Sequence, residues 1–408
     1  MTKPRTDDAL DVEALRARDF PWTREPGVAY LNSGSTGPLP ERTRRAVDAF
    51  NERRTRPDRI SDDALLTIGS RARGLCAGLI GADPDEIALG FNTSFGLNLA
   101  AAALDLQPGD RVLLQDGEFP ANVYPWLNQE RVRGIVVERI PRRPDGLPDE
   151  AAAIERLERG GVRAFAVSAV GFSNGFRADL ATISRICREQ GTYLIVDGIQ
   201  ALGVVPFDVR ETPVDIVACG GQKWLLSPWG SGFAYVRRGL IETLRPPVVG
   251  WLSFEASQDF GSLTDYRLDP VPEARRFELG TLGFGALVGL SESLSLLLEL
   301  GSDPIRRHVD GLQRRLVEWV ETRDDVEWAS DPAAERRSGI LAFRPPAAET
   351  VYERLRSAGV IVSLRESAIR TSIHAFNSPA DIERLIEVTE SALADRQPAP
   401  STIRRTSS

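Results

Sequence analysis

Two neighbouring stretches decide the fold: TYLIVDGIQALG at residues 192–203 and VDIVACGGQKW at residues 214–224. In the first, Asp197 comes directly after an apolar run, and in the second, Lys223 follows another such run. Nearly continuous apolar runs are expected of parallel strands that are covered on both faces. Open α/β sheets bind ligands just past the carboxyl ends of their strands. We therefore expect Asp197 and Lys223, of opposite charge, to meet at one edge of a buried sheet.

The same pattern extends in both directions along the chain. Between residues 87 and 236, short apolar runs such as 130–140 and 162–170 alternate with helical patterns, which we expect over 95–103 and 180–190. Strands that alternate with helices form βαβ units. The chain is therefore predicted to be an α/β protein with a mostly parallel sheet.

We expect four regions, divided by shifts in composition. They are an N-terminal arm at 1–29, a large domain at 30–285, a smaller α+β domain at 286–395, and a polar, Pro/Ser-rich tail at 396–408 that is expected to be disordered. The smaller domain should contain helices near 304–321 and 348–358, strands near 339–343, 359–364 and 368–374, and a closing helix from Pro379.

Composition excludes several classes of partner. The 408 residues are 42% hydrophobic and 26% charged, which suits a globular chain of two domains. A formal net charge of -8 gives no basic field for nucleic acid or anionic lipid. No secretion signal and no uninterrupted run of about 18 apolar residues stands out. We therefore expect a cytoplasmic protein that binds neither nucleic acid nor membrane.

Cysteine and histidine are too few for several kinds of chemistry. The three cysteines lie far apart and form no CxxC pair, so they predict core residues rather than disulfides or a zinc site. His308 and His374 are the only histidines, which disfavours a metal site and a Ser/His/Asp triad. His308 lies in a polar helical pattern and is expected at the surface.

Lysine usage points to a specific residue. All but two of the 50 basic residues are Arg, and the two lysines are Lys3 and Lys223. A codon bias toward Arg explains the scarcity of lysine, but it does not explain a lysine kept inside the fold. Arg stays protonated and forms no imine, whereas a desolvated Lys does Schiff-base chemistry. Lys223 is therefore predicted to be functional.

An amine and a carboxylate at one site suit pyridoxal 5'-phosphate (PLP). The amine binds the cofactor aldehyde, and the carboxylate keeps the pyridinium nitrogen protonated so that the ring accepts electrons. Thr93 and Ser94 stand at the start of a helical pattern, where phosphate finds donors. The structural alternatives are an Asp turn, a salt-bridging Lys and an ordinary helix cap, and they explain each residue singly but not the combination.

With these residues in place, the chain resembles the class V aminotransferases of PLP fold type I. It is most similar to their isopenicillin N epimerase-like and cysteine desulfurase-like branches. The resemblance covers roughly residues 30–388 and rests on an ordered series of motifs: LNSGSTG (31–37), NTS (92–94), EFPANVYPW (118–126), VDGIQALG (196–203), GGQKW (220–224), RRFELGT (275–281) and IRTS (369–372). It implies a seven-stranded-type sheet in the large domain and PLP held as a Schiff base on Lys223.

The resemblance also assigns roles around the cofactor. Thr93 and Ser94 would bind its phosphate, Phe119 would stack on the ring, and Asp197 would pair with the ring nitrogen. Two glutamines complete this set: Gln200 would reach the ring hydroxyl and Gln222 would lie beside the phosphate.

Four further positions bear on the substrate and on assembly. Thr281 matches the position that reaches a neighbouring subunit's phosphate, which implies a homodimer. Arg370 matches the arginine that grips the substrate carboxylate, a task that suits its two-bond fork. We also place Asn32 and His374 in the substrate pocket, His374 because it follows Arg370 by an even step on an expected strand.

Two departures narrow the reaction. The desulfurase-like branch carries a cysteine shortly before the carboxylate-binding arginine, but none occurs in VSLRESAIR (362–370), which disfavours a persulfide-forming desulfurase. That branch also has a histidine where this chain has Phe119, and a phenyl ring transfers no proton. We therefore rank transamination first, β-elimination by a C–S lyase second and amino-acid epimerisation third. A catalytically silent PLP-fold binding protein remains an alternative, and a nucleotide-binding protein is disfavoured because neither GxGxxG nor GxxxxGK[ST] occurs.

Overall fold

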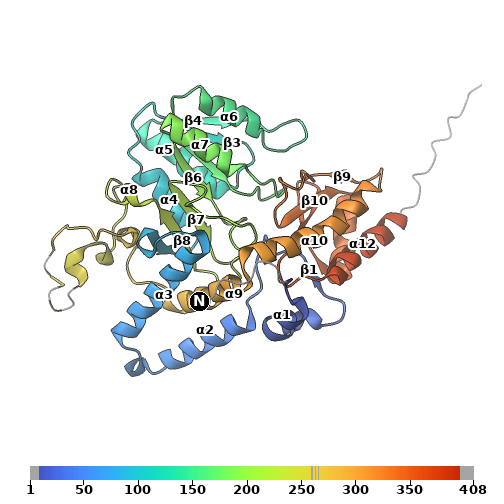
Figure 1. The fold of residues 1–408 in the computed structure, drawn as a ribbon, viewed down its shortest axis with the longest axis horizontal. Coiled ribbons are helices and arrows are strands. Elements are labelled where there is room, and N and C mark those ends of the chain that lie inside the picture. Colours follow the sequence, from blue (N-terminus) through green and yellow to red (C-terminus); the bar gives the residue numbers. More distant parts are fainter. Residues whose placement is uncertain (1–8, 259–260, 262, 265, 396–408) are drawn as a thin grey trace, which may run out of the picture.

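A computed structural model describes residues 9–258, 261, 263–264 and 266–395, so the expected tail and Lys3 lie outside the described residues. Figure 1 shows one lobe built around the larger sheet and a second lobe that holds the C-terminal helices, with α9 and α10 running between them. The helices are α1 Val12–Asp19, α2 Glu41–Arg54, α3 Asp62–Ile80, α4 Thr93–Ala103, α5 Tyr124–Arg133, α6 Glu150–Glu158, α7 Leu180–Gln190, α8 Arg238–Ile241, α9 Phe284–Leu300, α10 Ser302–Glu321, α11 Ala348–Ser357 and α12 Pro379–Ala394.

A seven-stranded sheet forms the centre of the larger lobe. Its strand order is β2-β8-β7-β6-β5-β3-β4, and β8 alone runs antiparallel to its neighbours. These strands are β2 Ile87–Gly90, β3 Arg111–Gln115, β4 Val136–Ile140, β5 Val162–Ser168, β6 Tyr193–Asp197, β7 Ile216–Gly220 and β8 Gly232–Val236. The predicted α/β fold with a mostly parallel sheet is confirmed.

The apolar strands are covered on both faces, as their sequences indicate. Along β7, Ile216 and Ala218 enter one hydrophobic core while Val217 and Cys219 enter the other, because successive side chains of a strand point to opposite faces. Helix α4 lies close against β7, where a Cβ on Gly96 would stand 2.7 Å from the Cβ of Ala218. The N-terminus of α4 is thereby held near the end of β7.

The smaller lobe is built on an antiparallel sheet of order β12-β13-β10-β9. Its strands are β9 Glu327–Trp328, β10 Ile340–Arg344, β12 Ser363–Arg365 and β13 Ala368–Ser372. Helix α11 packs against β12 and β13, and α12 packs against α10 and α11; the three helices lie close to where the sequence places them. A two-residue turn joins β12 to β13.

The segment after α1 links the two lobes. Strand β1 (Ala29–Tyr30) pairs in parallel with β11 (Val360–Ile361), and Asn32 forms a bridge with Ser372. The chain then crosses to the larger lobe, where the Gly37 N–H donates to the Gln222 carbonyl at 2.9 Å. The predicted divisions after residues 29, 285 and 395 remain predictions.

Helix α9 packs against α2 and α3 and meets α10 at a 76° bend. In the part of the chain that the structure describes, no single helix is long and apolar enough to span a membrane, although the bent pair α9 and α10 passes that test together by length and composition alone.

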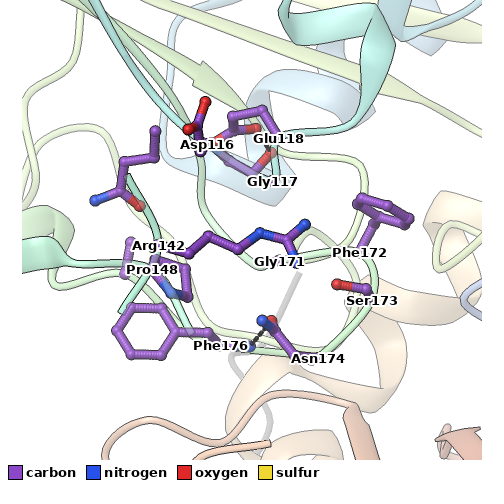
Figure 2. Close-up of a pocket in the computed structure, with 13 residues that line it drawn as sticks. Asp116, Gly117, Glu118, Arg142, Pro148, Gly171, Phe172, Ser173, Asn174 and Phe176 are labelled. Carbon is purple, nitrogen blue, oxygen red and sulfur yellow. Dashed lines mark hydrogen bonds between the residues drawn. The ribbon is translucent and has the colours of Figure 1, made fainter. Parts of the chain in front are cut away.

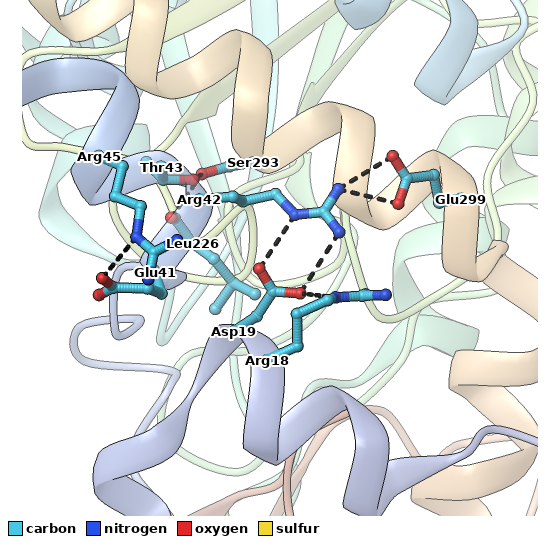
Figure 3. Close-up of polar contacts among 9 residues, drawn as sticks. All are labelled: Arg18, Asp19, Glu41, Arg42, Thr43, Arg45, Leu226, Ser293 and Glu299. Atoms are coloured by element: carbon cyan, nitrogen blue, oxygen red, sulfur yellow. Dashed lines mark hydrogen bonds and ion pairs between the residues drawn. The ribbon is translucent and has the colours of Figure 1, made fainter. Parts of the chain in front are cut away.

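Ion pairs around the buried Asp19 join α1 and α2 to this helix. Asp19 is 1% exposed and accepts hydrogen bonds from Arg18 at 2.7 Å and from Arg42 at 3.0 Å. Arg42 also donates to Glu299 on α9 at 2.8 Å (Figure 3). Three segments that are distant in sequence are therefore joined at one guanidinium.

A hydroxyl relay beside these ion pairs supports the segment that follows β7. The Thr43 and Ser293 hydroxyls lie 2.8 Å apart, and Ser293 Oγ donates to the Leu226 carbonyl at 2.7 Å (Figure 3). Leu226 has φ of 54°, a left-handed conformation that strains a side chain with a Cβ. The Ser293 hydrogen bond helps to hold this strained turn, three residues after Lys223.

We expect Gly37→Ala to disrupt this part of the fold. A Cβ at residue 37 would lie 1.9 Å from the Lys223 carbonyl oxygen, so one of the two backbone segments must move. Thermal unfolding should show a melting temperature lowered by several degrees. The matched control is Gly74→Ala on α3, where a Cβ meets nothing within 4 Å and helix propensity favours alanine. Equal melting temperatures for the two variants would contradict the close packing at Gly37.

Candidate active site

Lys223 lies in the turn just past the end of β7, as the sequence predicts. It is partly buried, and its carbonyl accepts the Leu226 N–H at 3.1 Å. Burial lowers the pKa of Lys223 to about 8, the Asp197 carboxylate opposes that shift, and the positive charge of Arg370 adds to it. A sizeable fraction of this amine is therefore neutral near physiological pH, which is the form that attacks an aldehyde or accepts a proton.

Asp197 is the last residue of β6, beside β7 in the sheet. It is 2% exposed and accepts the Ile199 N–H at 3.0 Å. Burial raises the pKa of Asp197 to about 7, the Ile199 hydrogen bond opposes that rise, and the negative charge of Glu118 adds to it. A cationic N–H placed against this carboxyl would hold it ionised.

Thr93, Ser94 and Gln222 surround the first turn of α4. Thr93 Oγ1 accepts the Gly220 N–H at 2.9 Å, and Ser94 is exposed beside it. A Cβ on Gly220 would lie 2.5 Å from Gln222 Oε1 and 3.2 Å from Thr93 Oγ1, so the side chains of Thr93 and Gln222 both lie against this glycine. Unpaired N–H groups at a helix start together with side-chain hydroxyls suit a phosphate.

Gln222 also carries an orphaned polar atom. Its Oε1 is buried and has no hydrogen-bond partner within the described residues. Because the orientation of an amide is an assignment, turning it would present the NH₂ group to a bound anion instead. The orphaned atom thus fits a group that binds here.

The aromatic ring of Phe119 lies close to the Lys223 amine and packs against the ring of Phe172. Lys223 Nζ lies 5.5 Å from the centroid of the Phe119 ring, and Phe172 meets that ring edge-on with centroids 5.3 Å apart. Phe119 is 42% exposed, so one side of its ring is free for a planar partner. This placement is compatible with the predicted stacking role.

Glu118, next to Phe119, is a residue that the sequence reasoning missed. Its carboxylate accepts the Ser168 N–H at 2.8 Å and the Asn122 amide at 3.1 Å, and it also contacts the Ser168 hydroxyl. Burial raises the pKa of Glu118. These bonds fix the Phe119 turn to the end of β5. The one feature of the sequence that could have drawn attention to Glu118 is its position directly before Phe119.

Gln200 is held rigidly behind the site. It is 3% exposed; its Oε1 accepts the Trp224 indole N–H at 2.7 Å, and its amide donates to the Gly34 carbonyl at 3.0 Å. One amide hydrogen remains for another acceptor. The predicted contact with the ring hydroxyl needs that hydrogen.

Arg370 is a buried cation that no carboxylate in the described part of the chain neutralises. It is 2% exposed on β13 and donates to the Phe172 carbonyl at 2.5 Å, to Ser35 Oγ at 2.7 Å and to Ser363 Oγ at 3.2 Å. Among the described residues no acid pairs with it, and its Nε has no partner. Burial lowers the pKa of Arg370 to about 10, and the charge of Arg365 adds to that shift. Because an unpaired buried charge is costly, an anionic ligand would stabilise it.

Asn32 reaches Arg370 through a serine. Ser363 Oγ donates to Asn32 Oδ1 at 2.6 Å and lies 3.2 Å from the Arg370 guanidinium. Asn32 therefore orients the group that contacts Arg370. Its direct contact with a substrate stays a prediction.

The structure places His374 elsewhere than in the substrate pocket. Strand β13 ends at Ser372, so the even step from Arg370 does not continue to residue 374. His374 is fully buried between Trp224 and Phe376; its Nε2 donates to the Trp224 carbonyl at 2.9 Å, and its Nδ1 accepts the Ala375 N–H at 2.7 Å. Both ring nitrogens are occupied, so the proposed substrate contact is wrong and His374 supports the lysine turn from behind.

His308 is also less exposed than predicted. It is partly buried on α10, with Nε2 2.9 Å from the Asn377 carbonyl, and burial lowers its pKa. The three cysteines are buried as expected, and burial raises the pKa of Cys76, Cys187 and Cys219, which leaves them poor nucleophiles.

Thr281 is exposed in the segment just before α9. Its neighbours Trp251 and Leu279 are exposed as well, at 44% and 46%. The predicted contact with a neighbouring subunit's phosphate stays a prediction.

The residues that the structure brings together fit PLP. Lys223 would bind the aldehyde carbon, Asp197 the ring nitrogen, and Thr93, Ser94 and Gln222 the phosphate. The fit rests on three observations: the lowered pKa of the Lys223 amine, the orphaned Gln222 amide oxygen, and the buried Asp197 carboxyl, to which no cationic group among the described residues donates a hydrogen bond.

Comparison with known proteins agrees with this geometry. The chain is 29% identical over 381 residues to the isopenicillin N epimerase of Streptomyces clavuligerus, which covers 90% of this chain and 95% of that protein. It is 26% identical over 403 residues to a probable cysteine desulfurase of Pyrococcus abyssi, which covers 91% and 96% of the two chains. An uncharacterised aminotransferase of Bacillus subtilis is 30% identical over 316 residues, or 78% of this chain and 81% of that one.

Solved structures show the same fold. The apo cysteine desulfurase of Thermococcus onnurineus superposes with a TM-score of 0.83 at 24% identity, covering 97% of this chain and 99% of that one. A cystine C–S lyase, in complex with cysteine persulfide, superposes with a TM-score of 0.82 at 22% identity, covering 93% and 100%.

The family model for class V aminotransferases matches residues 29–385, a span that includes every site residue discussed above. A match of this extent, with Lys223 and Asp197 adjoining at the carboxyl edge of the sheet, shows that the chain belongs to the class V aminotransferase family of PLP-dependent enzymes.

Proposed function

We propose that this enzyme catalyses transamination, in which the Cα proton of an amino acid is removed and delivered on the same face to the cofactor carbon that had carried the aldehyde. The observation that carries the proposal is the presence of one amine with a lowered pKa, Lys223, close to a buried and unpaired Arg370. The amine serves as base and acid in turn, while the guanidinium suits the α-carboxylate of the substrate.

When bound, PLP supplies an electron-withdrawing ring that stabilises negative charge at the substrate Cα. Asp197 would keep a positive charge at the ring nitrogen, and Phe119 would cover one face of the ring and exclude water from it. Arg370, oriented by Ser35 and Ser363, would hold the carboxylate so that the Cα–H bond faces Lys223 Nζ. Lys223 Nζ would accept the Cα proton and then donate it on the same face to the former aldehyde carbon of the cofactor.

Phe119 disfavours epimerisation. Inversion at Cα usually needs a second proton donor on the opposite face, and a phenyl ring donates no proton. Glu118 is adjacent in sequence, but its carboxylate is engaged by Ser168 and Asn122. A single lysine therefore favours a reaction that needs one acid–base group.

β-Elimination of a cysteine-type substrate is the second candidate, because several relatives are named cysteine desulfurases and the same lysine would serve as its base. The described residues hold no sulfur relay, since β12 and β13 are joined by Glu366 and Ser367 alone and the three cysteines are buried. A C–S lyase of this architecture would release the sulfur without a protein persulfide.

The hypothesis of a catalytically silent binding protein does not explain why Lys223, with its lowered pKa, lies next to an unpaired Arg370.

We also propose that the enzyme is a cytoplasmic homodimer. Exposed aromatic residues, including Trp229 at 73% and Trp251 at 44%, suit a surface that a partner subunit covers. The cytoplasmic location rests on composition alone, and cell fractionation tests it.

Light scattering of the dilute holoenzyme should give twice the mass of one chain. Thr281→Ala should weaken retention of PLP while leaving the dimer intact, because the threonine would reach the partner's phosphate. The control is Thr322→Ala, at the end of α10. A fully active monomer would rule out the shared site.

Products separate the two candidate reactions. The holoenzyme, incubated with a panel of amino acids and without an amino acceptor, should yield keto acid in amounts equal to the enzyme and should then stop, since the amino group stays with the cofactor. Continued release of ammonia or sulfide from cysteine or cystine would show that the reaction is β-elimination rather than transamination. Exchange of the Cα proton with inversion would show that it is epimerisation and would contradict both other assignments.

The pKa of Lys223 predicts how the apoenzyme captures PLP. Only the neutral amine reacts, so the rate should rise with pH and level off above about 8 rather than near the ordinary value of 10.5. Asp197→Asn removes an opposing charge and should shift this midpoint down, whereas Arg370→Gln removes a like charge and should shift it up. Stopped-flow absorbance measures the rate. A midpoint near 10, or one that neither variant moves, would contradict the lysine environment described here.

A further inference from the structure

The hairpin of β12 and β13 carries a second arginine on the face that holds Arg370. Ser363 pairs with Arg370 across the two antiparallel strands, and Arg365 pairs with Ala368. Directly opposed residues share a face of the sheet, and so do residues two apart on one strand. Since Ser363 contacts the Arg370 guanidinium, Arg365 lies on the same face, one step nearer the hairpin turn.

The charge of Arg365 acts on the active site. After burial, Arg365 is the cause that holds the pKa of Arg370 below its ordinary value. The same guanidinium also contributes to the lowered pKa of Lys223, after burial and the nearer charge of Arg370. The register of the hairpin places Arg365 on the same face as Arg370, and its effects on the pKa values of Arg370 and Lys223 indicate that its charge lies close to both groups.

No acid neutralises Arg365 among the residues that the structure describes. It is exposed, and its hydrogen bond goes to the Leu364 carbonyl at 2.8 Å. The neighbouring Glu366 is already used by Arg142, which donates to its two carboxylate oxygens at 2.8 and 3.1 Å. Two unpaired guanidinium groups, Arg365 and Arg370, therefore face one site.

The hairpin that carries Arg365 is anchored to the larger lobe. Its turn consists of Glu366 and Ser367, both left-handed, with φ of 49° and 58°. Arg142, just past β4, extends across the pocket between Glu118 and Asn174 (Figure 2), and its ion pair fixes the hairpin turn. The position of Arg365 relative to the site is thus set by a bidentate contact rather than by a free loop.

We propose that Arg365 binds a second anionic group on the substrate, so that the enzyme prefers acidic amino acids over neutral ones of the same size. This inference rests on the proposed function, in which Arg370 takes the α-carboxylate. Two like charges near one site repel each other, and a ligand with two negative groups neutralises both. A neutral side chain would leave Arg365 unpaired.

Matched ligands test this preference. Binding of L-aspartate, L-asparagine, L-glutamate and L-glutamine to the holoenzyme is titrated through the change in visible absorption of the cofactor. We expect the better of the two acids to bind roughly 10-fold more tightly than its amide, with a difference that shrinks as salt is added. Arg365→Gln should abolish that difference, because it weakens binding of the acid far more than binding of its amide. Arg188→Gln, an exposed arginine on α7, is the control and should retain the difference.

The outcomes separate this inference from the proposed function. Equal affinity for acid and amide in the parent enzyme, or a preference that survives Arg365→Gln, overturns the second anionic subsite alone. Loss of the dimer in Arg365→Gln also overturns it, because the arginine would then belong to an interface. If no amino acid perturbs the cofactor spectrum, the proposed function itself fails. Arg370→Gln should weaken all four ligands together, which distinguishes the two arginines.

Discussion

The burial of Lys223 beside Asp197 is the constraint on which the rest of the structure depends. An amine and a carboxyl are each destabilised in their charged forms when buried, and each is partly restored by the other. Burial lowers the pKa of Lys223 to about 8 and raises the pKa of Asp197 to about 7, and the charge of each residue limits the shift of the other. This is the state in which a lysine serves both as a covalent anchor and as a proton carrier.

Much of the surrounding fold holds this pair in place. Parallel strands β6 and β7 bring the two residues to one edge, and the turn after Lys223 is fixed from several directions. Gly37 packs against the Lys223 carbonyl, Ser293 bonds to the strained Leu226, and His374 bonds to the Trp224 carbonyl. These supports come from both lobes and from the segment before α2, so movements of the smaller lobe would be transmitted to the lysine turn.

The sequence was sufficient for the parts of the site that follow from strand periodicity. The apolar runs before Asp197 and Lys223 placed both residues at the carboxyl edge of the sheet, and the near absence of other lysines directed attention to Lys223. It failed for His374, because the strand ends at Ser372 and alternation says nothing beyond that point. It also missed Glu118, whose role depends on Ser168, 50 residues away, and no local pattern records such a contact. Within the described residues no acid lies beside Arg370, and this too was visible only in three dimensions.

The most direct test of the account is to locate the cofactor on the chain. Reduction of the holoenzyme with borohydride, followed by proteolysis and mass spectrometry, identifies the residue that carries the phosphopyridoxyl group. The account predicts a single labelled peptide that contains Lys223, and no label in Lys223→Ala. Label on Lys3, or no label on a protein that retains its yellow colour, would contradict it.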